Sequence, residues 1–239
     1  MISRVITGLV LIVGGGFLLY LGDYPLLLWI WFTSMVCIHE IVTMLKKKDV
    51  KVPFLLVAVP VSLIIGTLID PKFHTYWTHP LTKWFVLCAT GFYVAEVAMK
   101  RMFGFNHPVF AGIRVVILIS ATLPFVYLVR ESSQGLILII FSCVNIWAGD
   151  IFALFGGRKF GKTLLSEISP KKTVEGSIIG TVSALVISYI MIVGFELPVL
   201  PYLVLALVIS FIGQVGDLHE SLMKRACNVK DSSQLLPGH

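Results

Sequence analysis

Long apolar runs separated by short polar segments form the main pattern of this 239-residue chain. A helix that crosses the hydrocarbon core of a bilayer needs about 20 mostly apolar residues. Eight runs fit that requirement, at residues 5–21, 25–45, 53–69, 81–99, 110–129, 135–155, 177–194 and 197–216. The pattern predicts an all-α membrane protein, a polytopic bundle of about eight transmembrane helices.

The polar segments between these runs are short, apart from a loop at 156–176 and a tail at 216–239. No stretch is long and polar enough to form a separate soluble domain. We therefore expect a single polytopic membrane domain over 1–239, with N-terminal transmembrane helices in 1–134 and catalytic-type helices in 135–239.

Composition supports the membrane interpretation. The chain is 57% hydrophobic and 13% charged, with a mean hydropathy of +0.92, which excludes an ordinary soluble domain. A net charge of +6 could indicate a nucleic-acid partner, but the basic residues stand in short clusters between the apolar runs. Such clusters are typical of a topology signal, so no nucleic acid is expected.

The distribution of basic residues predicts the topology. If the N-terminus is cytoplasmic and the spans alternate, 16 of the 19 Lys and Arg residues face the cytoplasm. The three on the outside are Lys72, Lys83 and Arg130. This bias places both termini and loop 156–176 in the cytoplasm. The first run ends in YLGDYP without a small-residue cleavage site, which indicates a retained span.

Three carboxylates lie within apolar runs, where charged groups are functional candidates. Glu96 precedes Lys100 by four residues, a helical spacing that favours a structural ion pair. For Glu40, helix packing and a role in a site both remain open. Asp150 stands close to Asn145 and leads into the basic loop, which favours a role in a site.

Other polar features have structural interpretations. The four cysteines lie far apart without metal-site spacing, so we assign them no redox or metal role. His74 and His79 fit an interfacial loop rather than a metal site. Gly176 and Gly180 form a GxxxG pattern, which predicts close helix packing.

Residues 156–163, GGRKFGKT, match the phosphate-loop pattern GxxxxGK[ST] letter for letter. That loop must follow a buried strand and open a helix whose N-terminus receives the phosphates. Here an apolar helix precedes it, and Pro170 follows in SEISPKKT. We therefore reject a phosphate-loop NTPase, although this basic, glycine-rich loop can contact phosphates in another geometry.

A polar stripe crosses the end of the last apolar run. Its members are spaced by four, three, four and three residues, which places them on one helix face: Ser210, Gln214, Asp217, Ser221 and Lys224. A solvated helix leaving the membrane would carry similar charges, but this stripe begins inside the apolar run. We therefore interpret it as part of a site.

The charges around the stripe suit phosphoryl or nucleotidyl transfer. Asp217 and Glu220 can hold a divalent cation, while Lys224 and Arg225 can hold phosphate oxygens. This chemistry requires both, because charge on the transferring phosphorus must be neutralised while the attacking and leaving oxygens are held in line.

The run SLMKRACNVKDSSQLLPGH at 221–239 resembles the signature of the phosphatidate cytidylyltransferases, the CDP-diacylglycerol synthases. The matching positions are Ser221, Lys224, Arg225, Lys230, Asp231, Pro237, Gly238 and His239. Upstream elements of the family also match in order, at Asp150, 157–158, 160–162, 169–176 and 216–221. The resemblance covers roughly the C-terminal 90 residues.

The resemblance implies an enzyme that converts CTP and phosphatidate to CDP-diacylglycerol and pyrophosphate, with Mg²⁺ as cofactor. It also implies a multi-span protein of the bacterial inner membrane, commonly a homodimer, with its active site facing the cytoplasm. The expected catalytic residues are Asp217, which binds the metal, Lys224, Ser221 and Asp150. The expected substrate-binding residues are Arg158, Lys162, Lys171, Lys172, Arg225, Lys230, Asp231 and His239.

The printed sequence stops at His239, before the family's second glycine pair, its Asp-Arg-x-Asp element and a further apolar segment. The resemblance assigns part of the metal site to that element. We therefore expect Asp217 to be one of several metal ligands, and the 239-residue chain to be weakly active or inactive.

Two other functions stay open from the sequence. A CTP-dependent polyprenol or phytol kinase would use CTP beside a membrane in a similar way. A cation-coupled transporter would use the carboxylates Glu40 and Asp150, although no internal repeat supports it.

Overall fold

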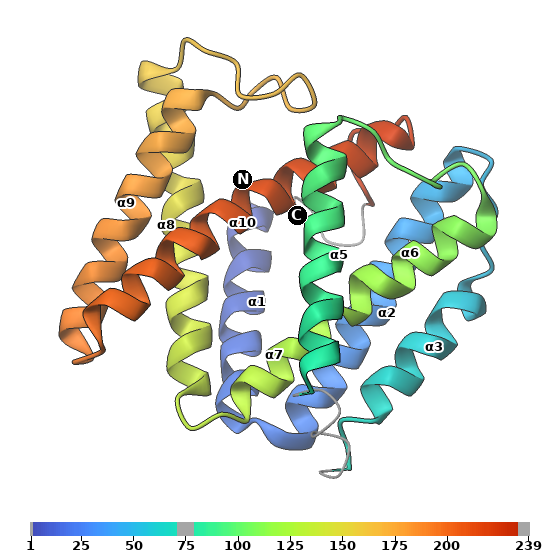
Figure 1. Ribbon diagram of the computed structural model, residues 1–239, viewed down its shortest axis with the longest axis horizontal. Coiled ribbons are helices and arrows are strands. Elements are labelled where there is room, and N and C mark those ends of the chain that lie inside the picture. The colour runs from blue at the N-terminus through green and yellow to red at the C-terminus, as the bar shows by residue number, and fades with distance from the viewer. Residues whose placement is uncertain (1, 71–78, 234–239) are drawn as a thin grey trace. The chain divides into compact units, whose positions relative to one another are not determined.

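The computed structural model describes residues 2–70 and 79–233. Helices account for the regular structure of this part of the chain (Figure 1): α1 (Ile2–Leu21), α2 (Asp23–Lys47), α3 (Phe54–Gly66), α5 (Pro80–Ala98), α6 (Pro108–Ser120), α7 (Leu123–Arg130), α8 (Gly135–Phe160), α9 (Val174–Gly194) and α10 (Val199–Ala226). Within the described residues, six helical segments are long and apolar enough to cross a membrane. The predicted all-α membrane fold is confirmed.

All eight predicted runs coincide with helices, but the fifth, at 110–129, is interrupted between α6 and α7. Thr122 turns its hydroxyl back to the carbonyl of Leu118 at 2.7 Å, and Pro124 stands in the first turn of α7. A proline has no N–H to continue a helical ladder and its ring clashes with the preceding turn. The interruption therefore has a local cause.

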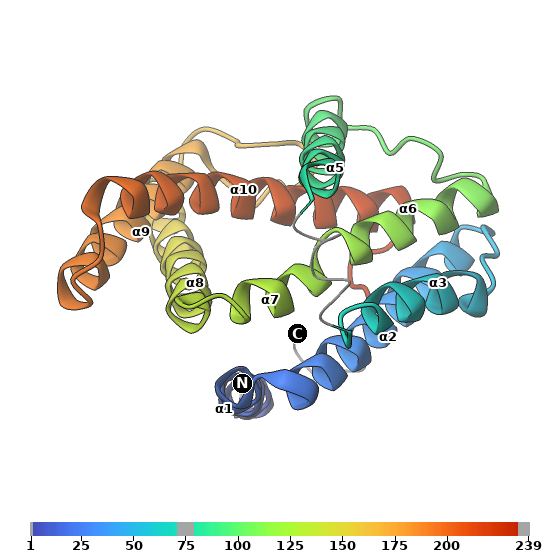
Figure 2. The same ribbon diagram turned by 60° about the horizontal axis from the view of Figure 1, so that its bottom comes forward.

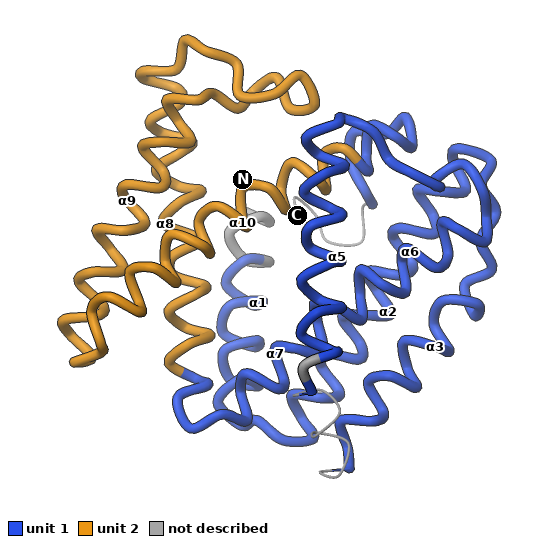
Figure 3. Tube along the Cα trace, viewed as in Figure 1, with its two compact units in different colours: residues 1–136, 223–239 blue, residues 137–222 orange. Residues whose placement is uncertain are grey.

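The chain forms two compact units (Figure 3), which we call unit 1 (Met1–Leu136 and Met223–His239) and unit 2 (Ile137–Leu222). Helices α2, α3 and α6 pack against one another in unit 1. Their contact is apolar and includes the fully buried side chains of Ile38, Val57 and Val61. The second part of unit 1, which begins at Met223, packs against this core through Met223 and Cys227.

The C-terminal end of α1 is capped from a distant part of unit 1. Arg130 donates from Nε to the carbonyl of Leu19 at 2.6 Å and from Nη2 to that of Tyr20 at 3.1 Å. The last carbonyls of a helix have no partner in the helix itself, and a cation there also complements the helix dipole. Gly22 follows with φ 68°, which allows the sharp turn into α2.

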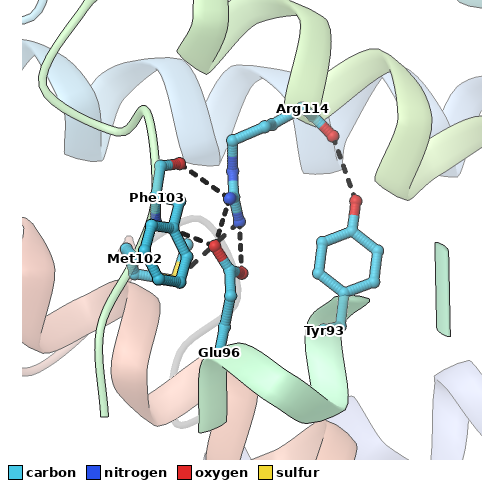
Figure 4. A network of polar contacts seen from close by, with 5 residues as sticks. All are labelled: Tyr93, Glu96, Met102, Phe103 and Arg114. Atoms are coloured by element: carbon cyan, nitrogen blue, oxygen red, sulfur yellow. Dashed lines mark hydrogen bonds and ion pairs between the residues drawn. The ribbon is translucent and has the colours of Figure 1, made fainter. Parts of the chain in front are cut away.

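A buried ion pair joins α5 to α6 (Figure 4). The carboxylate of Glu96, which is fully buried, accepts bonds from both terminal nitrogens of Arg114, one of them at 2.6 Å. The same residues fasten the intervening segment, because Phe103 donates its N–H to Glu96 at 2.8 Å and its carbonyl accepts from Arg114 at 2.8 Å. The ion pair therefore holds together α5, α6 and the segment between them at Phe103.

The prediction that Glu96 and Lys100 lie one turn apart on a helix is wrong, because α5 ends at Ala98 and Lys100 has φ 51°. The structural interpretation of Glu96 holds, since its carboxylate forms an ion pair with Arg114, 18 residues away in sequence.

Unit 2 contains α8, α9 and most of α10, and Figures 1 and 2 show α8 and α9 side by side. Small residues allow this approach. A Cβ atom on Gly180 would lie 2.6 Å from the carbonyl oxygen of Gly149, and one on Gly176 would lie 2.8 Å from that of Ala153. The predicted close packing through Gly176 and Gly180 is confirmed.

Candidate functional site

The glycine-rich stretch at 156–163 does not form a phosphate loop. Helix α8 continues through Phe160, so most of the stretch is helical, and the predicted loop at 156–176 is reduced to 161–173. Two of its glycines serve packing against the start of α9. A Cβ on Gly157 would lie 2.9 Å from the hydroxyl oxygen of Thr173, and one on Gly156 would lie 2.8 Å from Ile179.

The segment 161–173 is a folded strap. An isolated antiparallel bridge pairs Leu164 with Thr173, and the N–H of Leu165 donates to the carbonyl of Lys172 at 2.9 Å. The carboxylate of Glu175 accepts the backbone N–H groups of Lys162 and Thr163 at 3.1 Å. These bonds hold the backbone that carries the basic residues.

A junction of uncharged polar side chains joins the three helices of unit 2. Asn145 of α8 donates from Nδ2 to the hydroxyl of Ser188 on α9 at 2.9 Å. Its Oδ1 accepts from the hydroxyl of Ser210 on α10 at 3.0 Å. All three side chains are buried, so each bond satisfies a group that has no access to water.

A second junction lies one turn further along α10, and about two to three turns nearer the start of α9. Gln214 accepts a bond from Ser177 at its Oε1 and donates from Nε2 to the hydroxyl of Thr181 at 2.9 Å. The next turn of α10 brings Asp217, whose Oδ2 pairs with the ammonium of Lys172. Three successive members of the predicted stripe, Ser210, Gln214 and Asp217, therefore face the same side.

That side is a cavity of about 720 Å³ within unit 2. Its ionisable lining consists of Asp150, Arg158, Lys171, Lys172 and Asp217. The other lining residues are neutral and partly apolar, among them Asn145, Ile146, Leu154, Leu165, Ser177, Ile209, Ser210 and Gln214. The volume is that of a typical small-molecule site. Its mixed lining suits a ligand that carries phosphate and an apolar part.

Five of the predicted site residues thus meet in one cavity, and the others lie elsewhere. Lys162 is exposed outside the lining, and Ser221 is half-buried on α10 beyond it. Lys224, Arg225, Lys230 and Asp231 belong to unit 1. His239, like His74, lies outside the described residues. His79 has a structural role, because its Nδ1 accepts the N–H of Leu81 at the start of α5.

Within unit 1, Glu40 contacts the segment that follows α10. Its Oε1 accepts a bond from the hydroxyl of Ser233, two residues after Asp231. This contact favours a packing role for Glu40 over a part in the cavity of unit 2.

Sequence reasoning overlooked the α9 side of the cavity. Ser177, Thr181, Ala184 and Ser188 repeat the four-three-four spacing of the stripe on α10, but three small hydroxyls in an apolar run give a weak signal. Their partners on α8 and α10 are what identify them as one polar face. Glu175 was overlooked as well, because its role depends on the fold of the strap.

Two carboxylates, Asp150 and Asp217, are available for a metal ion in this cavity. They interact electrostatically with each other and with Lys172. No cluster of three or more His, Cys, Asp or Glu residues suited to a metal occurs among the described residues. Mg²⁺ commonly binds through one or two carboxylates and completes its shell with water and substrate phosphates. This donor set fits Mg²⁺.

Comparisons with known proteins agree on one family. The Cytidylyltransferase family matches residues 2–239 of this chain. A phosphatidate cytidylyltransferase of Bacillus subtilis is 32% identical over 243 residues, covering 99% of this chain and 89% of the relative. One of Staphylococcus aureus is 32% identical over 241 residues, covering 99% and 90%. One of Synechocystis is 44% identical over 110 residues, covering 44% and 36%.

Proposed function

This chain belongs to the cytidylyltransferase family, and we propose that it transfers a cytidylyl group from CTP to phosphatidate, giving CDP-diacylglycerol and pyrophosphate. The observation that carries the proposal is the set of charges that line the cavity in unit 2. Three cations and two carboxylates line it together with neutral and apolar side chains. A nucleotide triphosphate with its metal and a lipid phosphate need that combination of charges.

In this proposal the cations of the cavity bind phosphate. Arg158, Lys171 and Lys172 neutralise the pyrophosphate that leaves when the lipid phosphate attacks the α-phosphorus of CTP. The lipid phosphate needs little help from a general base, because a phosphate monoester is already anionic at pH 7.

The carboxylates hold the cofactor. Asp217, with Asp150 beside it, would hold Mg²⁺, which supplies charge neutralisation on the CTP phosphates. The signature residues remain predictions as further substrate-binding groups. They are Ser221 of unit 2, Lys224, Arg225, Lys230 and Asp231 of unit 1, and His239, which lies outside the described residues.

The test follows labelled CTP into chloroform-soluble lipid, with the complete gene product purified in detergent micelles that contain phosphatidate. Label should enter the lipid only when phosphatidate is present. Asp217→Asn should lower that rate on the order of 10²-fold or more, because it removes charge from the site of reaction. Glu196→Gln is the matched control, since Glu196 is exposed after α9 and outside the lining.

The mass of the lipid product separates the proposal from a lipid kinase. CDP-diacylglycerol contains cytidine, whereas a CTP-dependent kinase leaves only phosphate on its lipid. A phosphorylated lipid without cytidine, or Asp217→Asn with the activity of Glu196→Gln, contradicts the proposal.

The proposed topology has eight spans, both termini in the cytoplasm and the strap at 161–173 on the cytoplasmic side of the bacterial inner membrane. Its support is the charge pattern: the basic clusters at 46–51 and 100–114 share one side only if α3 crosses between them. A single cysteine at Asp70 should then react with an impermeant maleimide in intact cells. A homodimer is proposed from the family, and cross-linking in membranes tests it.

A further inference from the structure

The pair formed by Lys172 and Asp217 crosses the cavity of unit 2. Lys172 is the last but one residue of the strap, and its Nζ contacts Oδ2 of Asp217 on α10. Both side chains are partly open to solvent, with exposures of 28% for Lys172 and 45% for Asp217. The ion pair is therefore accessible to ligands that enter the cavity.

The backbone at Lys172 is held independently of this pair. Its carbonyl accepts the N–H of Leu165, and its N–H donates to the carbonyl of Ser169 at 3.0 Å. The next residue, Thr173, is the N-cap of α9 and accepts the N–H of Gly176 at 3.2 Å. The ammonium can therefore leave Asp217 through side-chain rotation while the strap keeps its fold.

A carboxylate oxygen in direct contact with an ammonium is a poor ligand for a divalent cation, because the two positive charges repel each other at that distance. The carboxylate of Asp217, which contacts Lys172, is the group that the proposed function assigns to metal binding. Asp150 lies close enough to interact with both residues, so the cavity holds two carboxylates and a competing cation.

We propose that Lys172 is an exchangeable counter-ion of Asp217: it leaves the carboxylate when a divalent cation binds there, and the released ammonium then binds phosphate. This inference rests on the proposed function for the identity of the ligands. It makes metal and phosphate binding interdependent, because the metal releases the group that phosphate uses. A site of this kind binds the metal weakly until a phosphate ligand stabilises the released lysine.

The test measures Mn²⁺ binding to the detergent-solubilised chain, from the loss of the free-ion spectrum in electron paramagnetic resonance. Without any phosphate ligand, Lys172→Met should bind Mn²⁺ about tenfold more tightly than the unchanged chain, within the usual range of coupling between sites. Lys171→Met is the matched control, because it removes the same charge from the neighbouring lining residue. Its Mn²⁺ affinity should change by less than about threefold.

Inorganic pyrophosphate provides the second arm. It should strengthen Mn²⁺ binding in the unchanged chain, and this strengthening should be much smaller in Lys172→Met. The inference is overturned by an unchanged or weaker Mn²⁺ affinity in Lys172→Met, by equal tightening in Lys171→Met, or by undiminished Mn²⁺ binding in Asp217→Asn.

A measurement on the unchanged chain covers the case in which Lys172→Met does not fold. Acetylation of lysines is followed by mass spectrometry with and without Mn²⁺, and Lys171 serves as the internal reference. Lys172 should react several times faster with Mn²⁺ present, and an unchanged ratio overturns the inference. Formation of a cytidine-containing lipid is scored separately, so the exchange and the proposed function can fail independently.

Discussion

Asn145 on α8 and Ser188 on α9 are joined by a hydrogen bond of 2.9 Å between two side chains with no exposure to solvent. The same asparagine accepts from Ser210 on α10, so one amide joins three helices. In a membrane, where apolar burial between helices gives little driving force, such bonds and close packing of small residues hold helices together.

The first prediction concerns this junction. Asn145→Leu should destabilise the protein by about 1–3 kcal/mol, because it leaves the hydroxyls of Ser188 and Ser210 buried without their partner. Thermal unfolding in detergent measures the loss. Ser142→Ala is the control on the same helix, since that hydroxyl donates to the carbonyl of Leu138 one turn earlier at 2.8 Å. Equal losses in both variants would show that the junction contributes nothing specific.

The second prediction concerns the glycines between α8 and α9. Gly180→Ala should cost about 1–3 kcal/mol, since its Cβ would meet the backbone of Gly149 and force the helices apart. Gly194→Ala, at the end of the same helix, has nothing within 4 Å of its new Cβ. It should leave stability unchanged or raise it, because alanine favours helix more than glycine does. A Gly180→Ala protein as stable as Gly194→Ala would contradict the packing assignment.

The third prediction concerns the buried ion pair of unit 1. Glu96→Gln or Arg114→Met alone should cost about 3–5 kcal/mol, because each breaks a buried ion pair that is held by two hydrogen bonds. The double variant should recover part of that loss, since both charges are then gone. A double-mutant cycle in thermal or denaturant unfolding measures the coupling. Simple additivity of the two losses would argue against a direct pair.

The fourth prediction concerns the strap. Glu175→Gln should weaken the bonds to the N–H groups of Lys162 and Thr163, because a neutral amide accepts less strongly than a carboxylate. Hydrogen exchange at 161–173 should accelerate about tenfold, because the strap then opens more often. Exchange in α10 should stay the same. Unchanged exchange in the strap would mean that other bonds hold it.

Strap mobility should also affect catalysis under the proposed function. Glu175→Gln, which loosens the backbone of Lys171 and Lys172, should raise KM for CTP more than it lowers kcat. The reason is that the two lysines bind substrate phosphate in the ground state as well as in the transition state. Steady-state kinetics with varied CTP measure the two constants. A fall in kcat at constant KM would instead give the strap a role confined to the transition state.

The sequence by itself determined that the protein is an all-α membrane protein and that its charged residues suit phosphoryl or nucleotidyl transfer. Apolar runs long enough to span a bilayer predict helices, because backbone polar groups in lipid must be satisfied within the segment. The four-three spacing of Ser210, Gln214 and Asp217 predicts one face, because helical geometry alone sets it. The ordered motifs around Asp150 and Ser221 carried the family, which the comparisons confirm.

Only the tertiary structure decided which groups meet. Glu96 forms an ion pair with Arg114, 18 residues away, because the chain turns back after α5 ends at Ala98. Most of the match to a phosphate loop is helical, and its first two glycines pack against the start of α9. Lys172 reaches Asp217 across 45 residues of sequence. Contacts of this kind depend on how helices pack and where backbones turn, which periodicity along a single chain does not encode.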